Sequence, residues 1–307
     1  MKFQKSFAVA AIAVMFLFFA GCESRQQSIM RENKYLAEHQ MEKVAKYYDG
    51  VIWTVVDGVT LTMDISAPEG KGPFPCVMII HGGGWTLHTN TIMKGMARYI
   101  TNRGYVVFNI NYRVLPDVKL EQIVNDAMGA LIWVKEHAPK YRGDPARIAV
   151  TGDSSGGHLT AMIVTQAGNP VFKPSYKGNG KTDLTVTCAA PSYGVFDFIS
   201  LSNKWGASIT GDYIGESYKQ NPDRYKLLSP GLNIKPGLPP QLIIVGDHDP
   251  LRGQNESYVK ALQTAGNPVE LWIYKGKGHA FLNNFWDETG VKGYGRILEF
   301  LDKNLKK

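Results

Sequence analysis

The sequence predicts an α/β protein in which an eight-stranded, mostly parallel sheet is covered by helices on both faces. Short apolar runs rich in β-branched residues alternate along the chain with segments at helical spacing, which is typical of parallel sheets. Two of these runs end in glycine-rich turns, His81-Gly82-Gly83-Gly84-Trp85 and Gly152-Asp153-Ser154-Ser155-Gly156-Gly157. The length of 307 residues, of which 44% are hydrophobic, suits one large domain with a sizeable core.

The N-terminus has the features of an exported bacterial protein. Lys2 and Lys5 precede an apolar stretch, residues 7–20, which ends at Gly21-Cys22. This boundary resembles the lipobox of bacterial lipoproteins, although Phe19 stands where leucine is more usual. The resemblance implies lipidation of Cys22 and anchoring to a bacterial membrane, in the periplasm or at the outer membrane. The alternative is an uncleaved membrane anchor. We therefore expect a signal peptide over 1–21, a polar tether over 22–34 and the folded domain over 35–307.

Composition excludes several classes of partner and cofactor. The formal net charge is +7, but the basic residues are scattered and form no block interleaved with aromatics, so nucleic acid is not expected. No metal-binding spacing is present, and we expect neither a metal nor an organic cofactor. Cys76 and Cys188 lie in apolar strand-like runs and are interpreted as small core residues, with a single disulfide between them left open.

The predicted elements begin with a helix and a hairpin. Residues 35–48 have apolar positions near one helical face, and 51–56 and 60–65 alternate as a hairpin around Asp57-Gly58. Beyond the hairpin we expect strands at 76–80, 105–110 and 148–151 and helices at 92–102, 120–137 and 158–166.

The C-terminal part continues the same alternation. We expect strands at 184–190, 242–245 and 269–274 and helices at 257–265 and 290–305. Residues 198–238 are predicted to be irregular, and a connection of this length often forms a lid or a pocket wall.

Ser154 is the candidate nucleophile. It lies at the centre of Gly152-x-Ser154-x-Gly156, between a predicted strand and a predicted helix, and this setting resembles the nucleophile elbow of α/β-hydrolases. Such a turn is so tight that the flanking positions favour glycine. Ser155 carries the competing hydroxyl but is off the centre of the glycine frame, so it is expected to contribute its backbone N–H.

The first glycine-rich turn is the candidate oxyanion hole. Acyl transfer develops negative charge on a carbonyl oxygen, and backbone N–H groups reach that oxygen only where no side chain blocks them. We expect the N–H groups of Gly83, Gly84 and Ser155 to meet it. His81 is interpreted as structural.

A serine nucleophile needs a base, and the base needs an orienting carboxylate. His279 is the candidate base, because it follows the last predicted strand and lies in the glycine-flanked loop Lys275-Gly276-Lys277-Gly278-His279. Asp249 is the preferred acid, since Pro250 after it fixes the turn. Asp247 and Asp197 remain alternatives. Trp85, Tyr193 and Phe281 are expected to line the substrate pocket, although each suits core packing equally well.

Together these motifs identify a family resemblance. The chain resembles serine esterases of the α/β-hydrolase superfamily, close to the hormone-sensitive-lipase-like and the acetyl-esterase or feruloyl-esterase-like bacterial groups. The matching segments span residues 51–305 and include His81 to Trp85, Asn111-Tyr112-Arg113, Asp144 to Val150, Gly152 to Gly157, Asp249-Pro250-Leu251 and Gly278 to Phe281.

The chain departs from the family at three points. Ser155 replaces a usual alanine, Asn111 replaces a common aspartate, and the N-terminal segment is shorter than the usual helical cap. A short cap implies an open pocket and small acyl esters rather than long-chain lipids.

The resemblance implies a serine carboxylester hydrolase with a Ser154-His279-Asp249 triad. Its expected substrate is a small-molecule or carbohydrate ester, with acetyl or feruloyl esters of plant polysaccharide as candidates. Two alternatives remain at this stage: an amidase or exopeptidase on the same triad, and a surface binding protein that has lost activity.

Overall fold

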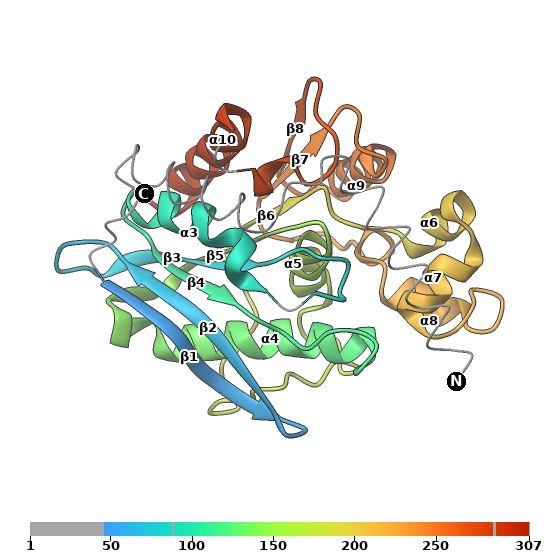
Figure 1. Ribbon diagram of the computed structural model, residues 1–307. Helices are drawn as coiled ribbons and strands as arrows, with labels where there is room; N and C mark the ends of the chain where they lie inside the picture. The colour runs from blue at the N-terminus through green and yellow to red at the C-terminus, as the bar shows by residue number, and fades with distance from the viewer. Residues whose placement is uncertain (1–45, 88, 285–286, 307) are drawn as a thin grey trace, which may run out of the picture.

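An eight-stranded sheet forms the centre of the computed structural model, which describes residues 46–306 except 88, 285 and 286 (Figure 1). The strand order is β1-β2-β4-β3-β5-β6-β7-β8. β1 and β2 form an antiparallel hairpin, β2 pairs antiparallel with β4, and the other neighbours pair parallel, which confirms the predicted α/β-hydrolase fold. The strands are β1 (Lys46–Val56), β2 (Val59–Ala67), β3 (Phe74–Ile80), β4 (Val106–Ile110), β5 (Gly143–Asp153), β6 (Cys188–Ser192), β7 (Gln241–Gly246) and β8 (Val269–Tyr274).

Helices cover both faces of this sheet because its strands are apolar on both sides. In β3, Val77 and Ile79 pack with α3 and α10, whereas Met78 and Ile80 belong to the core on the side of α4 and α5. α9 packs beside α5. These helices are α3 (Lys94–Thr101), preceded by the 3-10 turn η1 (Asn90–Met93), α4 (Leu120–His137), followed by η2 (Ala138–Tyr141), α5 (Ser155–Gln166), α9 (Arg252–Thr264) and α10 (Glu288–Leu305).

The first strand corrects one prediction and leaves others untested. Lys46, Tyr47 and Tyr48 belong to β1, so the end of the predicted helix 35–48 is wrong: these residues pair with Ala67, Ser66 and Ile65 of β2. Its remaining part, the signal peptide, the tether and Cys22 lie outside the described residues. The predicted hairpin around Asp57-Gly58 is confirmed.

The segment between β6 and β7 forms a small helical cap, seen at the right of Figure 1. It contains α6 (Phe198–Trp205), α7 (Ala207–Ile214), α8 (Pro222–Leu227) and the 3-10 turn η3 (Pro230–Leu232), so the prediction that 198–238 is irregular was wrong. Arg224 of α8 donates from Nε and Nη2 to the two carboxylate oxygens of Glu121 in α4, at 2.6 and 2.7 Å. Gln166 of α5 donates to the carbonyl of Leu227 at 3.0 Å. The cap is therefore tied to the helical layer beneath it.

β6 begins later than predicted. The apolar run from Leu184 indicates a strand over 184–190, but pairing with β5 starts only at Cys188. Asp183 accepts hydrogen bonds from the N–H and hydroxyl of Thr185, at 2.9 and 2.6 Å, and pairs with Lys135. These local bonds turn the chain before it enters the sheet.

Cys76 and Cys188 are both buried free thiols. Cys76 lies on β3 and Cys188 on β6, and β5 separates these strands in the sheet. The disulfide that the sequence left open is therefore not formed. Burial raises the pKa of each thiol to about 12, which keeps both protonated.

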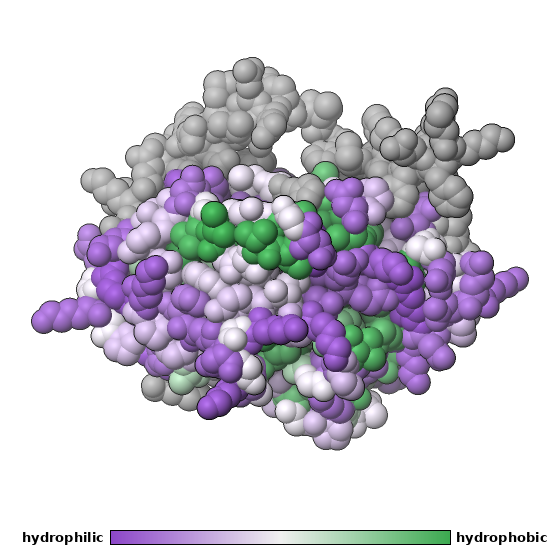
Figure 2. All heavy atoms as spheres, turned by 90° about the horizontal axis from the view of Figure 1, so that it is seen from below, coloured by the Kyte–Doolittle hydropathy of each residue, from purple (hydrophilic) through white to green (hydrophobic). Residues whose placement is uncertain are grey.

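Exposed apolar side chains concentrate on the β1–β2 hairpin. Of the nine large hydrophobic residues exposed in the described chain, four lie there: Tyr47, Ile52, Val55 and Val59. The hairpin lies at the lower edge of Figure 1 and so belongs to the face that Figure 2 shows, where apolar groups interrupt a mainly hydrophilic surface. Within the described part of the chain, no helix is both long enough and apolar enough to span a membrane.

Candidate active site

Ser154 occupies a strained turn between β5 and α5. Its backbone has φ 51° and ψ −116°, a conformation that residues other than glycine rarely adopt. The turn packs closely on the end of β3: a Cβ on Gly156 would lie 2.0 Å from the carbonyl oxygen of Ile80, and one on Gly152 would lie 2.5 Å from the same atom. Both flanking glycines are therefore required by these close contacts.

Three side chains that are far apart in the sequence form one hydrogen-bonded chain. His279 Nε2 lies 2.8 Å from Ser154 Oγ, and His279 Nδ1 lies 2.9 Å from Asp249 Oδ2. The side chain of Asp249 is fully buried and that of His279 is 6% exposed. Because a carboxylate only accepts, Nδ1 carries the proton and Nε2 is left to accept the serine proton. The structure thus brings together the predicted nucleophile, base and acid.

The two alternative acids have other partners. Asp247 Oδ1 accepts a hydrogen bond from the N–H of Lys277 at 3.2 Å, within the loop that precedes His279. Asp197 caps α6, accepting from the N–H groups of Ile199 and Ser200 at 2.8 and 3.1 Å. Asp249 itself is held by the N–H of Leu251, which donates to Oδ1 at 2.8 Å.

The glycine loop after β3 presents backbone N–H donors beside the hydrogen-bonded side chains of Ser154, His279 and Asp249. Gly83 and Gly84 have φ 118° and 60°, in the left-handed region that favours glycine. No described residue accepts a hydrogen bond from the N–H of either. Ser155 opens α5, and the N–H groups of the first helical turn have no acceptor within the helix. Three backbone donors are thus available for a developing oxyanion.

Asp153, which sequence reasoning did not single out, connects the segments of the site. Its buried carboxylate accepts from the N–H of Gly82 at 2.6 Å and from Nδ2 of Asn283 at 3.1 Å. Burial raises the pKa of this carboxyl, while the two hydrogen bonds act in the opposite direction. The signal in the sequence was an acidic residue inside an otherwise small and neutral turn.

The three predicted pocket residues are buried instead. Tyr193 has no exposed surface, and its ring meets the His279 ring edge-on at a centroid distance of 5.0 Å. Phe281, 6% exposed, packs against Tyr193 at 5.6 Å. Trp85 is 3% exposed. Tyr193 thus takes the core-packing role that the sequence left open, and its ring supports the His279 ring. Trp85 and Phe281 likewise lie almost wholly in the core.

Trp85 is hydrogen-bonded to a buried histidine, His158, for which the sequence indicated no role. Trp85 Nε1 donates to His158 Nδ1 at 3.2 Å, and His158 Nε2 donates to the carbonyl of Leu228 at 2.9 Å. Burial lowers the pKa of His158 to about 4, so it is neutral at physiological pH. These two hydrogen bonds link the glycine loop to Leu228, at the end of α8 in the cap.

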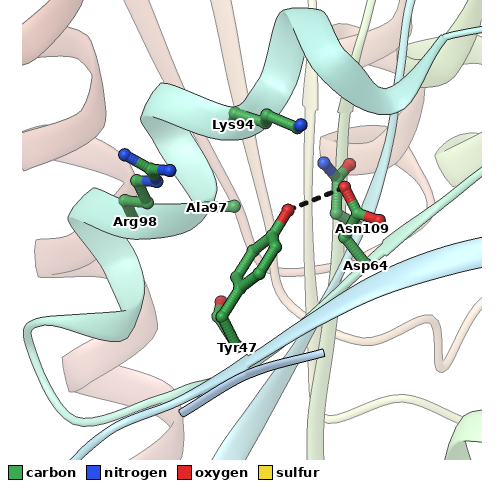
Figure 3. A pocket seen from close by; sticks show the side chains of 7 residues that line it. Tyr47, Asp64, Lys94, Ala97, Arg98 and Asn109 are labelled. Carbon is green, nitrogen blue, oxygen red and sulfur yellow. Dashed lines mark hydrogen bonds between the residues drawn. The ribbon is translucent and has the colours of Figure 1, made fainter. Parts of the chain in front are cut away.

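A second polar cluster lies between α3 and the strands β1, β2 and β4 (Figure 3). Tyr47 donates to Asp64 Oδ2 at 2.9 Å, and Lys94, Arg98 and Asn109 surround a space of about 10 Å³. That volume holds about one water molecule, too little for an ester. A larger hollow of about 330 Å³ lies near Pro145 and Ile148, at the end of β5 opposite Ser154. Within the described ranges, no three His, Cys, Asp or Glu side chains gather as a metal site.

Curated relatives with similar sequences are named as esterases. The carboxylic ester hydrolase LipN of Mycobacterium tuberculosis is 34% identical over 232 residues, covering 71% of this chain and 60% of LipN. The carboxylesterase NlhH of the same species is 32% identical over 224 residues, covering 70% of this chain and 69% of NlhH. The chain spans 46% of a third relative, the esterase LipQ.

Solved structures share the same architecture. A thermophilic esterase from the planctomycete Thermogutta terrifontis, with propionate bound, has a TM-score of 0.69 and 26% identity over 86% of this chain and 94% of that chain. A truncated carbohydrate esterase from gut microbiota has a TM-score of 0.75 over 86% of this chain and 98% of that chain, and at 23% identity it supports the fold alone. The BD-FAE family model matches residues 63–262. Since this match extends over more than half of the chain, and the sheet has the predicted arrangement, the protein belongs to the BD-FAE family of α/β-hydrolases.

Proposed function

We propose that this protein is a serine carboxylester hydrolase. The observation that carries the proposal is the hydrogen-bonded chain Ser154–His279–Asp249, with distances of 2.8 and 2.9 Å, beside a glycine loop with unused N–H donors. The esterase names of several relatives agree with it.

The reaction proceeds through an acyl-enzyme. Ser154 Oγ attacks the ester carbonyl while His279 Nε2 takes its proton, and Asp249 stabilises the imidazolium that forms. The N–H groups of Gly83, Gly84 and Ser155 hold the oxyanion. His279 then protonates the leaving alcohol, and a water molecule, deprotonated by the same nitrogen, releases the acid.

The substrate we propose is an ester of a small acyl group, with acetyl and feruloyl esters of polysaccharide as candidates. Structures of the Thermogutta esterase contain propionate and butyrate, which supports a short acyl chain. For location, we propose export and lipid anchoring through Cys22, on the strength of the Gly21-Cys22 boundary.

Hydrolysis rates test the activity. The panel is p-nitrophenyl acetate, butyrate and decanoate, methyl ferulate and an aminoacyl anilide. We expect rapid acetate or ferulate cleavage that disappears in Ser154→Ala. Cleavage of the anilide alone would identify an amidase instead, and binding of sugar esters without turnover would indicate a binding protein.

Labelling tests the nucleophile independently of substrate choice. The Thermogutta esterase is phosphorylated by paraoxon. We expect paraoxon to label the peptide that contains Ser154 in the wild-type protein, and to leave Ser154→Ala unlabelled. A label on Ser155 alone would contradict the assignment.

A further inference from the structure

A tyrosine of the cap lies against the glycine loop. The hydroxyl oxygen of Tyr213, in α7, is 4.0 Å from the position that a Cβ on Gly84 would occupy. Its ring packs on the Trp85 ring at a centroid distance of 5.1 Å, with an interplanar angle of 62°. The cap therefore places a phenol beside the loop that supplies the proposed oxyanion donors.

This hydroxyl has no hydrogen-bond partner among the described residues, although Tyr213 is only partly exposed. Desolvation by the surrounding groups raises the pKa of Tyr213 to about 12, so the hydroxyl keeps its proton and remains a donor throughout the physiological range. A partly desolvated donor without an acceptor costs free energy, and a ligand that supplies the acceptor recovers it.

The acceptor differs from the reacting carbonyl oxygen. In the proposed reaction, the N–H groups of Gly83, Gly84 and Ser155 already converge on that oxygen and fill its acceptor positions. An additional donor near Gly84 meets another atom of the substrate, one that lies close to the carbonyl.

We propose that Tyr213 is a substrate-binding residue whose hydroxyl donates to a second oxygen of the ester, an ether or hydroxyl oxygen near the reacting carbonyl. This inference rests on the proposed esterase function. The shared chemistry is an acceptor oxygen in either half of the ester, acyl or alcohol. The site accordingly prefers oxygen-bearing esters over alkyl esters of the same shape.

Two pairs of nearly isosteric esters test the proposal with wild type and Tyr213→Phe. p-Nitrophenyl methoxyacetate and p-nitrophenyl butyrate differ by one ether oxygen on the acyl side. 2-Methoxyethyl acetate and n-butyl acetate differ in the same way on the alcohol side. The substitution keeps the ring on Trp85, and comparing the two proteins on each ester cancels intrinsic reactivity.

We expect Tyr213→Phe to lower kcat/KM for the ether member of one pair by about 3- to 10-fold more than for its alkyl partner, the range typical of one neutral hydrogen bond. The pair that responds identifies the half of the ester that Tyr213 contacts. The matched control is Tyr218→Phe, a partly buried cap tyrosine whose ring packs on Tyr225 at 5.4 Å, and it should leave both ratios unchanged.

Equal losses on both members of each pair would overturn the inference, because they indicate an oxyanion donor or a packing role. Wild-type kcat/KM of Tyr213→Phe on all four esters would overturn it as well. If the wild-type protein hydrolyses none of the four esters, the proposed function itself fails, whereas turnover without a change in preference contradicts only the role of Tyr213.

Discussion

The carboxylate of Asp153 accepts a hydrogen bond from the backbone N–H of Gly82 at 2.6 Å, and so joins the turn that carries Ser154 to the glycine loop. Its second oxygen accepts from Asn283, four residues after His279. One buried side chain thus holds together three segments that supply the proposed nucleophile, oxyanion donors and base.

Replacing Asp153 by alanine should lower both stability and turnover. The change leaves the buried Gly82 N–H and the partly buried Asn283 amide without acceptors, and an unpaired buried donor costs about 1–3 kcal/mol. We expect Asp153→Ala to lose about 2 kcal/mol or more in urea unfolding and to reduce kcat. Asp153→Asn is the matched control: its amide oxygen still accepts from Gly82, and Asn283 can turn its unused Oδ1 toward the new amide. Wild-type stability and turnover in Asp153→Ala would contradict the role.

Two neighbouring aspartates should respond very differently to the same substitution. Asp249→Asn removes the acceptor that fixes the His279 tautomer, and kcat should fall by about 10³- to 10⁴-fold, as expected for a triad acid. Asp247→Asn keeps an oxygen for the Lys277 N–H and should retain kcat within about 3-fold. Steady-state kinetics on p-nitrophenyl acetate measures both, and the reverse order would assign the acid to Asp247.

His158 should make stability depend on pH. Its folded pKa of about 4 lies below the value of 6.5 for a free histidine, so between these values the unfolded chain binds more protons. The contribution is complete above about pH 6.5 and is lost as the pH falls toward 4, by on the order of 3 kcal/mol. Urea unfolding at successive pH values measures it. His158→Gln, which can still accept from Trp85 and donate to Leu228, should show a shallower slope in this window, and an unchanged slope would refute the assignment.

Two glycine-to-alanine substitutions should have opposite outcomes. Gly156→Ala places a methyl group 2.0 Å from the Ile80 carbonyl oxygen, so the elbow must shift, and we expect poor folding and no activity. Gly253→Ala, in the first turn of α9, meets no atom within 4 Å. It should be neutral or stabilising by about 0.5 kcal/mol, because alanine favours the helix. Thermal unfolding and activity decide both cases.

The sequence identified most of the sheet and the proposed triad because their signals are local. The helix 120–137 is periodic and long enough to be recognised alone, the run 76–80 is uninterrupted and apolar, and Ser154 lies in a glycine frame. The cap was misjudged because α6, α7 and α8 are short helices that depend on packing and capping, such as that of Asp197, rather than on a strong periodicity.

Contacts between distant segments could not be predicted. The position of Tyr193 just after a strand suggests that it lines the pocket. Its burial depends on how His279 and Phe281 pack against it. The same holds for Asp153 with Gly82 and for Trp85 with His158, since each pair is separated by more than 70 residues. Only the fold brings such partners together.

The bidentate pair between Arg224 and Glu121 also bears on how substrate reaches the site. Together with the Gln166–Leu227 and His158–Leu228 hydrogen bonds, it fastens the cap at several points to helices of the sheet layer. A cap held in this way is not a mobile lid that opens at a lipid–water interface. The proposed esterase should therefore lack interfacial activation: its rate on tributyrin should level off as the ester reaches its solubility limit, because only dissolved ester is hydrolysed, without the jump that marks lipases with mobile lids.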